Sequence, residues 1–261
     1  MRKPRRLSSD ELAPYSLELG RFRTRPRPVG PPSDTSPLTP ANSLTPYPSP
    51  LTPSLDWPSL FGNANPVEIE VGMGKGLFLL TQATTRPDVN FFGIEIVRKY
   101  QLYAATRYAI RRLPNIKTTC ADALVILQDH VRAGSVSVVH VLFPDPWWKS
   151  RHKKRRVFTP IFAAEIARVL ATGGRLHIAS DVEEYFGVMT GIVQAMPAFR
   201  ELTSEISHDS VDVAGYQTNF ERKARLKGTP IWRATYERTT EAVTIAADPA
   251  EKPPGALAPG S

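Results

Sequence analysis

From Pro66 onward, strand-like apolar runs alternate with helix-like segments, and this alternation restricts the possible folds more than any other feature of the chain. The predicted strands are 67–72, 90–96, 115–122, 135–143 and 175–181. The predicted helices are 76–84, 98–113, 123–131, 159–170 and 182–196. Gly173-Gly174 predicts the end of the fourth helix, and 199–206 and 231–237 are typical of two closing strands. Such alternation favours an α/β, Rossmann-like fold, a mostly parallel twisted sheet with helices on both faces.

Residues 1–60 differ in composition from the rest, because they are rich in Pro, Ser and Thr and poor in branched apolar residues. Fourteen of the 25 prolines lie in the first 66 residues. Such a segment cannot bury enough apolar surface to offset the entropy lost on ordering it. We expect residues 1–60 to form a disordered arm and linker, residues 61–240 the folded domain, and residues 241–261 a flexible tail.

Acidic residues and glycines lie at the ends of the first three predicted strands, where ligands of parallel sheets bind. Gly72 and Gly74 let the backbone approach a ligand closely. Glu95 suits hydrogen bonds to ribose hydroxyls, and Asp122 suits an adenine amino group. Glu70 lies inside a strand, where a carboxylate is costly to bury unless it is paired or binds something. This set suits a cofactor with hydroxyl, amine and sulfonium groups better than an anionic dinucleotide.

The segment FPDPWWKSRHKKRR, residues 143–156, follows the fourth strand and combines one acid with a dense group of cations. Prolines on both sides fix the backbone of Asp145, which we expect to face the reacting group. From Val67 onward the chain has 25 Lys/Arg against 20 Asp/Glu, and six of these cations lie between Lys149 and Arg156. The excess positive charge is therefore concentrated in one segment, as expected for contacts with nucleic-acid phosphates.

Together with HIASDVEEY and TNFERK, this segment resembles the tRNA (guanine-N7-)-methyltransferase (TrmB-like) family of class I S-adenosylmethionine-dependent methyltransferases. The resemblance covers about residues 66–238. It implies S-adenosylmethionine as the cofactor, tRNA as the partner, and transfer of a methyl group to N7 of a guanosine in the variable loop. It implies no metal. Guanine N7 carries a lone pair and no proton, so alignment and charge stabilisation matter and no general base is needed.

Matched motif by motif, the resemblance implies a role for each of three groups of residues. The catalytic group is Asp145. The cofactor contacts are Glu70, Gly72, Gly74, Glu95, Asp122 and Asp145. The substrate contacts are Lys149, Arg151, His152, Lys153, Lys154, Arg155, Arg156, Asp181, Thr218, Asn219, Phe220 and Glu221. His177 is expected to be structural, and the individual roles of Trp147 and Trp148 stay open.

Three other classes of protein share part of the pattern. An amino-group methyltransferase also has prolines after the fourth strand, but the TNFE segment has no role there. A nicotinamide-dependent oxidoreductase uses a similar glycine turn, but Asp122 and the basic segment then go unexplained. A non-catalytic RNA-binding protein on the same scaffold would not need acids at every strand end.

The lone cysteine, Cys120, excludes an intramolecular disulfide and a cysteine-rich zinc site. No apolar run approaches the length of a membrane span, and the basic N-terminus lacks the apolar core of a secretory signal. We expect a cytoplasmic protein without membrane contact, either a monomer or a homodimer.

Overall fold

The computed structural model describes residues 7–19, 54–147, 156–207, 218, 221 and 228–243. Within these residues, eight strands form one sheet in the order β1-β4-β3-β2-β5-β6-β8-β7. The strands are β1 (Ser16–Leu17), β2 (Val67–Val71), β3 (Asn90–Glu95), β4 (Ile116–Cys120), β5 (Val136–Leu142), β6 (Leu170–Ser180), β7 (Phe199–Ser207) and β8 (Ile231–Arg238). The helices are α1 (Ser9–Leu12), α2 (Trp57–Phe61), α3 (Leu77–Thr85), α4 (Arg98–Arg111), α5 (Ala123–His130), α6 (Pro160–Val169) and α7 (Glu183–Gln194).

The sheet is mostly parallel, which confirms the predicted fold class. All neighbouring pairs from β1 to β6 are parallel, whereas β8 runs antiparallel to β6 and β7 runs antiparallel to β8. Every residue of the central strands β2 and β3 is buried, as expected for parallel strands covered on both faces.

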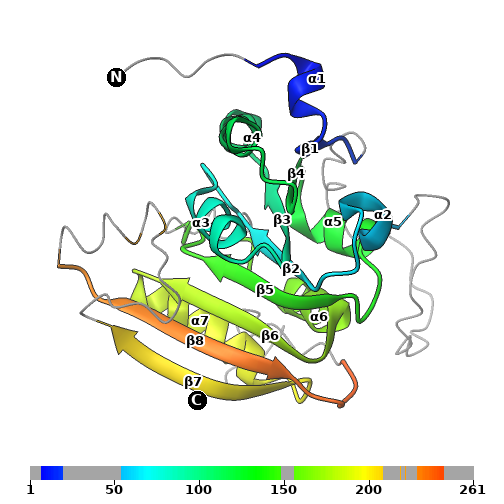
Figure 1. Cartoon of the computed structure of the whole chain (residues 1–261). Coiled ribbons are helices and arrows are strands. Elements are labelled where there is room, and N and C mark those ends of the chain that lie inside the picture. Colours follow the sequence, from blue (N-terminus) through cyan, green and yellow to red (C-terminus); the bar gives the residue numbers. More distant parts are fainter. Residues whose placement is uncertain are drawn as a thin grey trace, which may run out of the picture.

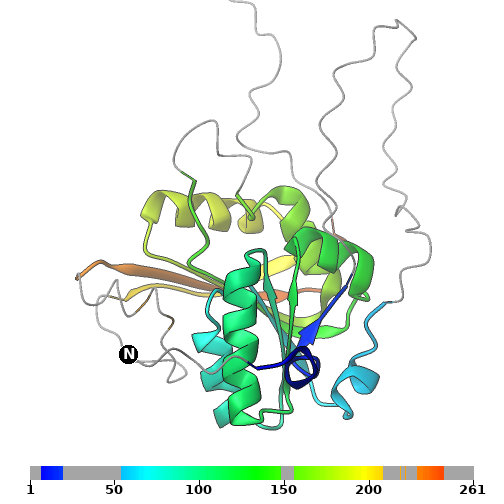
Figure 2. The same cartoon turned by 90° about the horizontal axis from the view of Figure 1, so that it is seen from above.

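Helices cover the two faces of the sheet unequally. Helices α5, α6 and α7 lie on one face, where Ile126, Phe162 and Met189 are completely buried in the main core (Figure 2). Helices α3 and α4 lie on the other face, over β2, β3 and β4 (Figure 1). On this second face, the described helices leave β5, β6 and β8 without a helical cover.

The boundary between α6 and β6 differs from the prediction. The helix was expected to end at Gly173-Gly174, but it ends at Val169, and β6 begins at once because Leu170 already pairs with Val136 of β5. The pairing then shifts register before Arg175. Gly173 has a φ of 79°, which favours glycine, so the two glycines form an irregularity within the strand rather than a helix end.

Residues 7–19 also differ from the expectation of a disordered arm. Ser8 and Glu11 form a capping box at the start of α1. β1 then pairs in parallel with β4 at the edge of the sheet, and the Thr118 amide donates to the carbonyl of Tyr15 at 2.9 Å. Lys117 Nζ donates to the carbonyl of Pro14 at 2.7 Å. This part of the arm therefore docks on the folded domain.

Candidate active site

The turn between β2 and α3 is built from three glycines with positive φ. Gly72, Gly74 and Gly76 have φ angles of 75°, 53° and 65°. A Cβ atom added to Gly72 or Gly74 would meet nothing within 4 Å, so the backbone faces open space there. A Cβ atom at Gly76 would instead lie 1.8 Å from the hydroxyl oxygen of Tyr108 on α4. The first two glycines thus leave room beside the turn, and the third allows α3 and α4 to pack.

Glu95 holds this turn in place from the end of β3. Its carboxylate accepts a hydrogen bond from the amide of Gly74 and another from the amide of Val97, both at 2.8 Å. The side chain is 6% exposed. The predicted ribose-binding acid therefore also fixes the backbone of the glycine turn.

Glu70 points from β2 toward the same turn and is 4% exposed. Its Oε2 atom has no hydrogen-bond partner within the described residues. Burial, together with the nearby charge of Glu95, raises the pKa of the Glu70 carboxyl to about 8. A small cavity of about 30 Å³ lies here, lined among others by Glu70, Gly72, Gly74 and Thr218. The structure therefore brings three predicted cofactor residues together with one predicted substrate residue.

Asp122 occupies the N-cap position of α5, directly after β4. Its Oδ1 atom accepts a hydrogen bond from the amide of Leu124 at 2.9 Å. A carboxylate has further acceptor sites, so the cap leaves Asp122 able to bind a donor at this edge of the sheet.

The loop after β5 carries backbone strain on both sides of Asp145. Phe143 and Trp147 have φ angles of 52° and 44°, a region that residues other than glycine rarely adopt. The amide of Phe143 donates to the carbonyl of Ala179 at 2.8 Å, which ties the start of the loop to β6. Asp145 itself is exposed. Strain at such positions persists only where the surroundings enforce it, and it is concentrated at functional sites.

Arg156 fastens the other end of this loop. Its Nε atom donates to the carbonyl of Pro146 at 2.8 Å, and its guanidinium carbon lies 4.8 Å from the ring centroid of Tyr185. Burial raises the pKa of the Tyr185 hydroxyl to about 12. Arg156 therefore has partners within the protein, unlike a cation that extends only into solvent. The predicted contacts Lys149 and Arg151 to Arg155, together with Trp148, lie outside the described residues.

The remaining predicted substrate residues that the structure describes lie after the end of β6 and in the segment before β8. Asp181 is half-buried and follows the end of β6. Thr218 is buried, and its hydroxyl accepts a hydrogen bond from the amide of Glu221 at 2.9 Å. Glu221 is 1% exposed and pairs with Arg233 of β8 at 2.7 Å. Asn219 and Phe220 lie outside the described residues.

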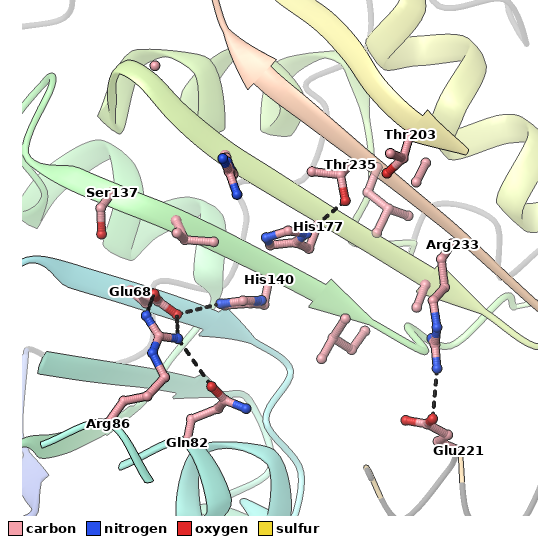
Figure 3. Close-up of a pocket in the computed structure, with 17 residues that line it drawn as sticks. Glu68, Gln82, Arg86, Ser137, His140, His177, Thr203, Glu221, Arg233 and Thr235 are labelled. Atoms are coloured by element: carbon pink, nitrogen blue, oxygen red, sulfur yellow. Dashed lines mark hydrogen bonds and ion pairs between the residues drawn. The ribbon is translucent and has the colours of Figure 1, made fainter. Parts of the chain in front are cut away.

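A larger pocket of about 430 Å³ lies on the sheet face that the described helices leave uncovered. Figure 3 shows Glu68, Arg86 and Gln82 at one end, the Glu221–Arg233 pair at the other, and two histidines between them. Burial alone would raise the pKa of Glu68, but hydrogen bonds from His140 and Arg86 lower it to about 2. Leu142 lines both this pocket and the small cavity beside Glu70. The two cavities are therefore neighbours.

Sequence reasoning did not identify most of this larger pocket. His140 and His177 are register partners on β5 and β6, and their rings stack with centroids 5.2 Å apart. One sequence pattern could have indicated this pocket: Glu68 and Glu70 lie two residues apart, so both acids share one face of a buried strand. His177, read as structural, does hydrogen-bond to Thr235 at 3.0 Å.

Comparisons with known proteins agree with the fold and the motifs. A family model described as "Putative methyltransferase" matches residues 64–234. The chain is 41% identical over 197 residues to a protein of Rhodopirellula baltica named tRNA (guanine-N(7)-)-methyltransferase, with 73% of each chain covered. It is 34% identical over 184 residues to a protein of the same name from Hydrogenovibrio crunogenus, which covers 70% of this chain and 77% of the relative.

Solved structures resemble the chain in fold alone. A 16S rRNA methyltransferase superposes with a TM-score of 0.53 at 17% identity, covering 69% of this chain and 91% of the other. An antibiotic-related methyltransferase superposes with the same TM-score at 14% identity, covering 68% and 90%. Within the described ranges, each helix is too short or too polar to cross a membrane.

Proposed function

The chain belongs to the tRNA (guanine-N(7)-)-methyltransferase family, and we infer from this membership how its own residues serve the reaction. The protein transfers the methyl group of S-adenosylmethionine to N7 of a guanosine in tRNA. The structural observation that best supports this function is Glu70 Oε2, which is buried beside an open glycine turn and has no hydrogen-bond partner among the described residues. Membership of this family sets aside the oxidoreductase, amino-group methyltransferase and non-catalytic alternatives.

The residues at the strand ends fit S-adenosylmethionine by their chemistry. Glu70 offers an orphaned, buried oxygen, which suits the ammonium group of the methionine part. Gly72 and Gly74 leave space beside the backbone for close approach. We assign the ribose hydroxyls to Glu95 and the adenine amino group to Asp122, and Asp145 borders both cofactor and substrate. When bound, the cofactor supplies an electrophilic methyl group on a sulfonium centre.

We assign orientation of the guanine to Asp145. Its carboxylate accepts hydrogen bonds from N1–H and from the exocyclic amine of the base, and it offsets the positive charge that develops on the purine. Because N7 has no proton to lose, the chain needs no general base at this site. The strained backbone at Phe143 and Trp147 supports this assignment, since it holds the intervening loop in one conformation. We assign further contacts with the guanosine to Asp181, Thr218, Asn219, Phe220 and Glu221.

The basic segment has two roles in this proposal. Lys149, Arg151, His152, Lys153, Lys154 and Arg155 hold tRNA phosphates, which provide affinity without sequence information. Arg156 instead positions the Asp145 loop, and its contacts with Pro146 and Tyr185 support this change from the sequence-based interpretation.

The limits of the catalytic domain and the cellular setting are also proposals. We propose residues 61–240 as the catalytic domain and residues 241–261 as a tail, and the family match over residues 64–234 supports the domain limits. A tRNA substrate supports a cytoplasmic location. We propose a protein that acts as a monomer or homodimer without a second kind of subunit.

One experiment tests the function and the role of Asp145 together. The protein is incubated with methyl-labelled S-adenosylmethionine and tRNA that lacks N7-methylguanosine, and the digested nucleosides are separated. The label is expected in N7-methylguanosine, and label at another atom would contradict the function. Asp145→Ala should abolish turnover while tRNA binding persists, and Asp145→Asn should retain part of the activity because one acceptor oxygen remains. Full activity in Asp145→Ala would refute the assignment to Asp145.

A further inference from the structure

The larger pocket has a floor of hydrogen-bonding side chains. A cross-strand row of register partners runs from Glu70 through His140, His177 and Thr235 to Thr203, so these side chains share one face of the sheet. Of these five residues, all except Glu70 line the larger pocket. Burial, with the charge of His140, lowers the pKa of His177 to about 3, so its ring is neutral at physiological pH. The floor therefore offers hydrogen bonds to a polar group that lies over the sheet.

Two buried polar atoms of this pocket have no hydrogen-bond partner within the described residues, namely Gln82 Nε2 and His140 Nδ1. Gln82 is 1% exposed and His140 is 5% exposed. His140 Nε2 lies 2.9 Å from Glu68 Oε2, which leaves Nδ1 as the ring nitrogen without a partner in the described part of the chain, and Gln82 Nε2 is a donor. An unmade hydrogen bond at a buried atom is unfavourable, so both atoms favour a bound partner. The edges of nucleobases offer both donors and acceptors side by side, so a base can satisfy two adjacent polar atoms of this kind.

The rim of the pocket, unlike its floor, carries arginine side chains. Arg86 pairs with Glu68, and Arg233 pairs with Glu221. Arg175 is exposed and forms no ion pair within the described part of the chain, although it lines the same pocket. A hydrogen-bonding floor beneath a free cation matches a nucleotide whose base is inside and whose phosphate is outside. The volume of about 430 Å³ is within the range of small-ligand pockets, roughly 300 to 1,000 Å³.

The position of the pocket identifies which nucleotide it would take. It shares Leu142 with the cavity beside Glu70, and Glu221 at one end belongs to the proposed guanosine contacts. We propose that this pocket binds a second nucleotide of the same tRNA, one that adjoins the methylated guanosine in the RNA chain. The base lies over Gln82 and His140, beside His177, and the phosphate contacts Arg175. This inference rests on the proposed function, because it takes tRNA as the substrate.

Two variants test the floor and the rim separately through equilibrium binding of tRNA without cofactor. Arg175→Ala removes the rim cation, and His177→Gln changes the floor. We expect each to raise the Kd for tRNA by about tenfold, the size of one lost base or phosphate contact. Arg175→Ala should also reduce the slope of log Kd against log salt by about 0.7 to 0.9, whereas His177→Gln should leave that slope unchanged. The exposed Arg111 of α4 provides a matched control, and Arg111→Ala should change neither quantity.

A second arm uses tRNA with an abasic site on either side of the guanosine that the wild-type protein methylates. One of the two abasic sites should raise the Kd of the wild type for tRNA. With that abasic tRNA, His177→Gln should raise the Kd by less than about twofold more, because the base that contacts His177 is already missing. The proposal is overturned if the variants bind intact tRNA with the Kd of the wild type. It is likewise overturned if the increase in Kd from the abasic site and the increase from His177→Gln simply multiply when the two changes are combined. It is also overturned if a free nucleoside monophosphate binds the pocket without competing with tRNA.

The binding readout separates this inference from the function on which it rests. Cofactor Kd and thermal midpoint are measured for each variant, and both should match the wild type, which excludes misfolding as the cause. If the wild type binds tRNA with these contacts but transfers no methyl group, the proposed function fails and the pocket assignment stands. If the wild type methylates tRNA and the variants bind it normally, only the pocket assignment fails.

Discussion

Glu70 is a buried carboxyl group, and its charged form is unfavourable there unless a cation lies beside it. The carboxyl is 4% exposed, and the neighbouring acid Glu95 is already committed to the amides of Gly74 and Val97. In the cofactor-free protein the pKa of Glu70 is raised to about 8, so this carboxyl holds a proton near neutral pH. An ammonium group that binds here favours the carboxylate and displaces that proton.

We predict that cofactor binding at neutral pH releases up to about one proton, and that cofactor affinity rises with pH until about 8, where Glu70 ionises unaided. Isothermal titration calorimetry in two buffers with different ionisation enthalpies measures this proton. Glu70→Gln should bind the cofactor more weakly and release no proton. Equal binding enthalpies in both buffers for the wild type would show that Glu70 is not the site of the ammonium.

Arg156 and Arg155 are adjacent in sequence, but we predict different effects when each is changed. Arg156→Ala frees the loop that carries Asp145, so kcat should fall by about tenfold or more while the salt dependence of tRNA binding stays the same. Arg155→Ala should weaken tRNA binding and flatten its salt dependence, with kcat retained. Single-turnover rates and binding at several salt concentrations distinguish the two effects. Equal loss of salt dependence in both variants would return Arg156 to the phosphate contacts.

The sequence predicted which residue types lie at this site but not all of their partners. The positions of Glu70, Glu95 and Asp122 follow from the strand pattern, because strand ends in a parallel sheet converge on one edge. The contact of Arg156 with Tyr185 joins residues 29 positions apart through the packing of α7. Local sequence patterns contain no information on such a contact, and a run of cations therefore suggested a single function.

At the level of elements, Gly76 determines how closely α3 and α4 can pack. It has a positive φ, its carbonyl accepts a hydrogen bond from Tyr108 at 3.0 Å, and the space for a Cβ atom is filled by the Tyr108 hydroxyl. Both the conformation and the contact require glycine here.

Gly76→Ala should therefore lower the free energy of unfolding by at least about 2 kcal/mol, because it combines backbone strain with a steric clash. Gly72→Ala is the matched control: it has a similar φ but open space, so it should lose only about 1 kcal/mol from backbone strain. Urea unfolding of both variants measures the difference. Equal losses would mean that the contact with Tyr108 adjusts without cost.

Elements with strong internal patterns were predictable, and those defined by distant pairing were not. The apolar strands β2, β3 and β5 lie within one or two residues of their predicted limits. The first part of β6 was missed because Leu170 becomes a strand residue only by pairing with Val136. β1 has two residues, too few for any periodicity, and it exists because β4 offers an edge.

At the scale of the whole molecule, two buried groups affect stability in opposite directions as pH changes. The folded pKa of Glu70 is about 8 against 4.5 for the free group, so stability falls as pH rises through that interval. The folded pKa of His177 is about 3 against 6.5, so stability is lost as pH falls through that interval. The two effects oppose each other between 4.5 and 6.5, and Glu70 acts alone from 6.5 to about 8.

We predict that the free energy of unfolding is nearly flat between pH 4.5 and 6.5 and then declines toward about pH 8, by up to about 1.4 kcal/mol per unit. Denaturant unfolding of the cofactor-free protein at several pH values measures this curve. Glu70→Gln should remove the decline above 6.5 and leave the loss of stability on the acid side to His177 and, below about pH 4.5, to Glu68 as well. An unchanged decline in that variant would assign it to another group.

The docked N-terminal arm has a consequence for association between copies of the protein. An edge strand presents unpaired amide and carbonyl groups that another chain can extend into a continuous sheet. Because β1 and the Tyr15 carbonyl occupy β4 beside Thr118 and Thr119, that edge is already closed by the protein's own chain. A homodimer with the arm in place therefore cannot form by pairing a second chain with Thr118 and Thr119 of β4.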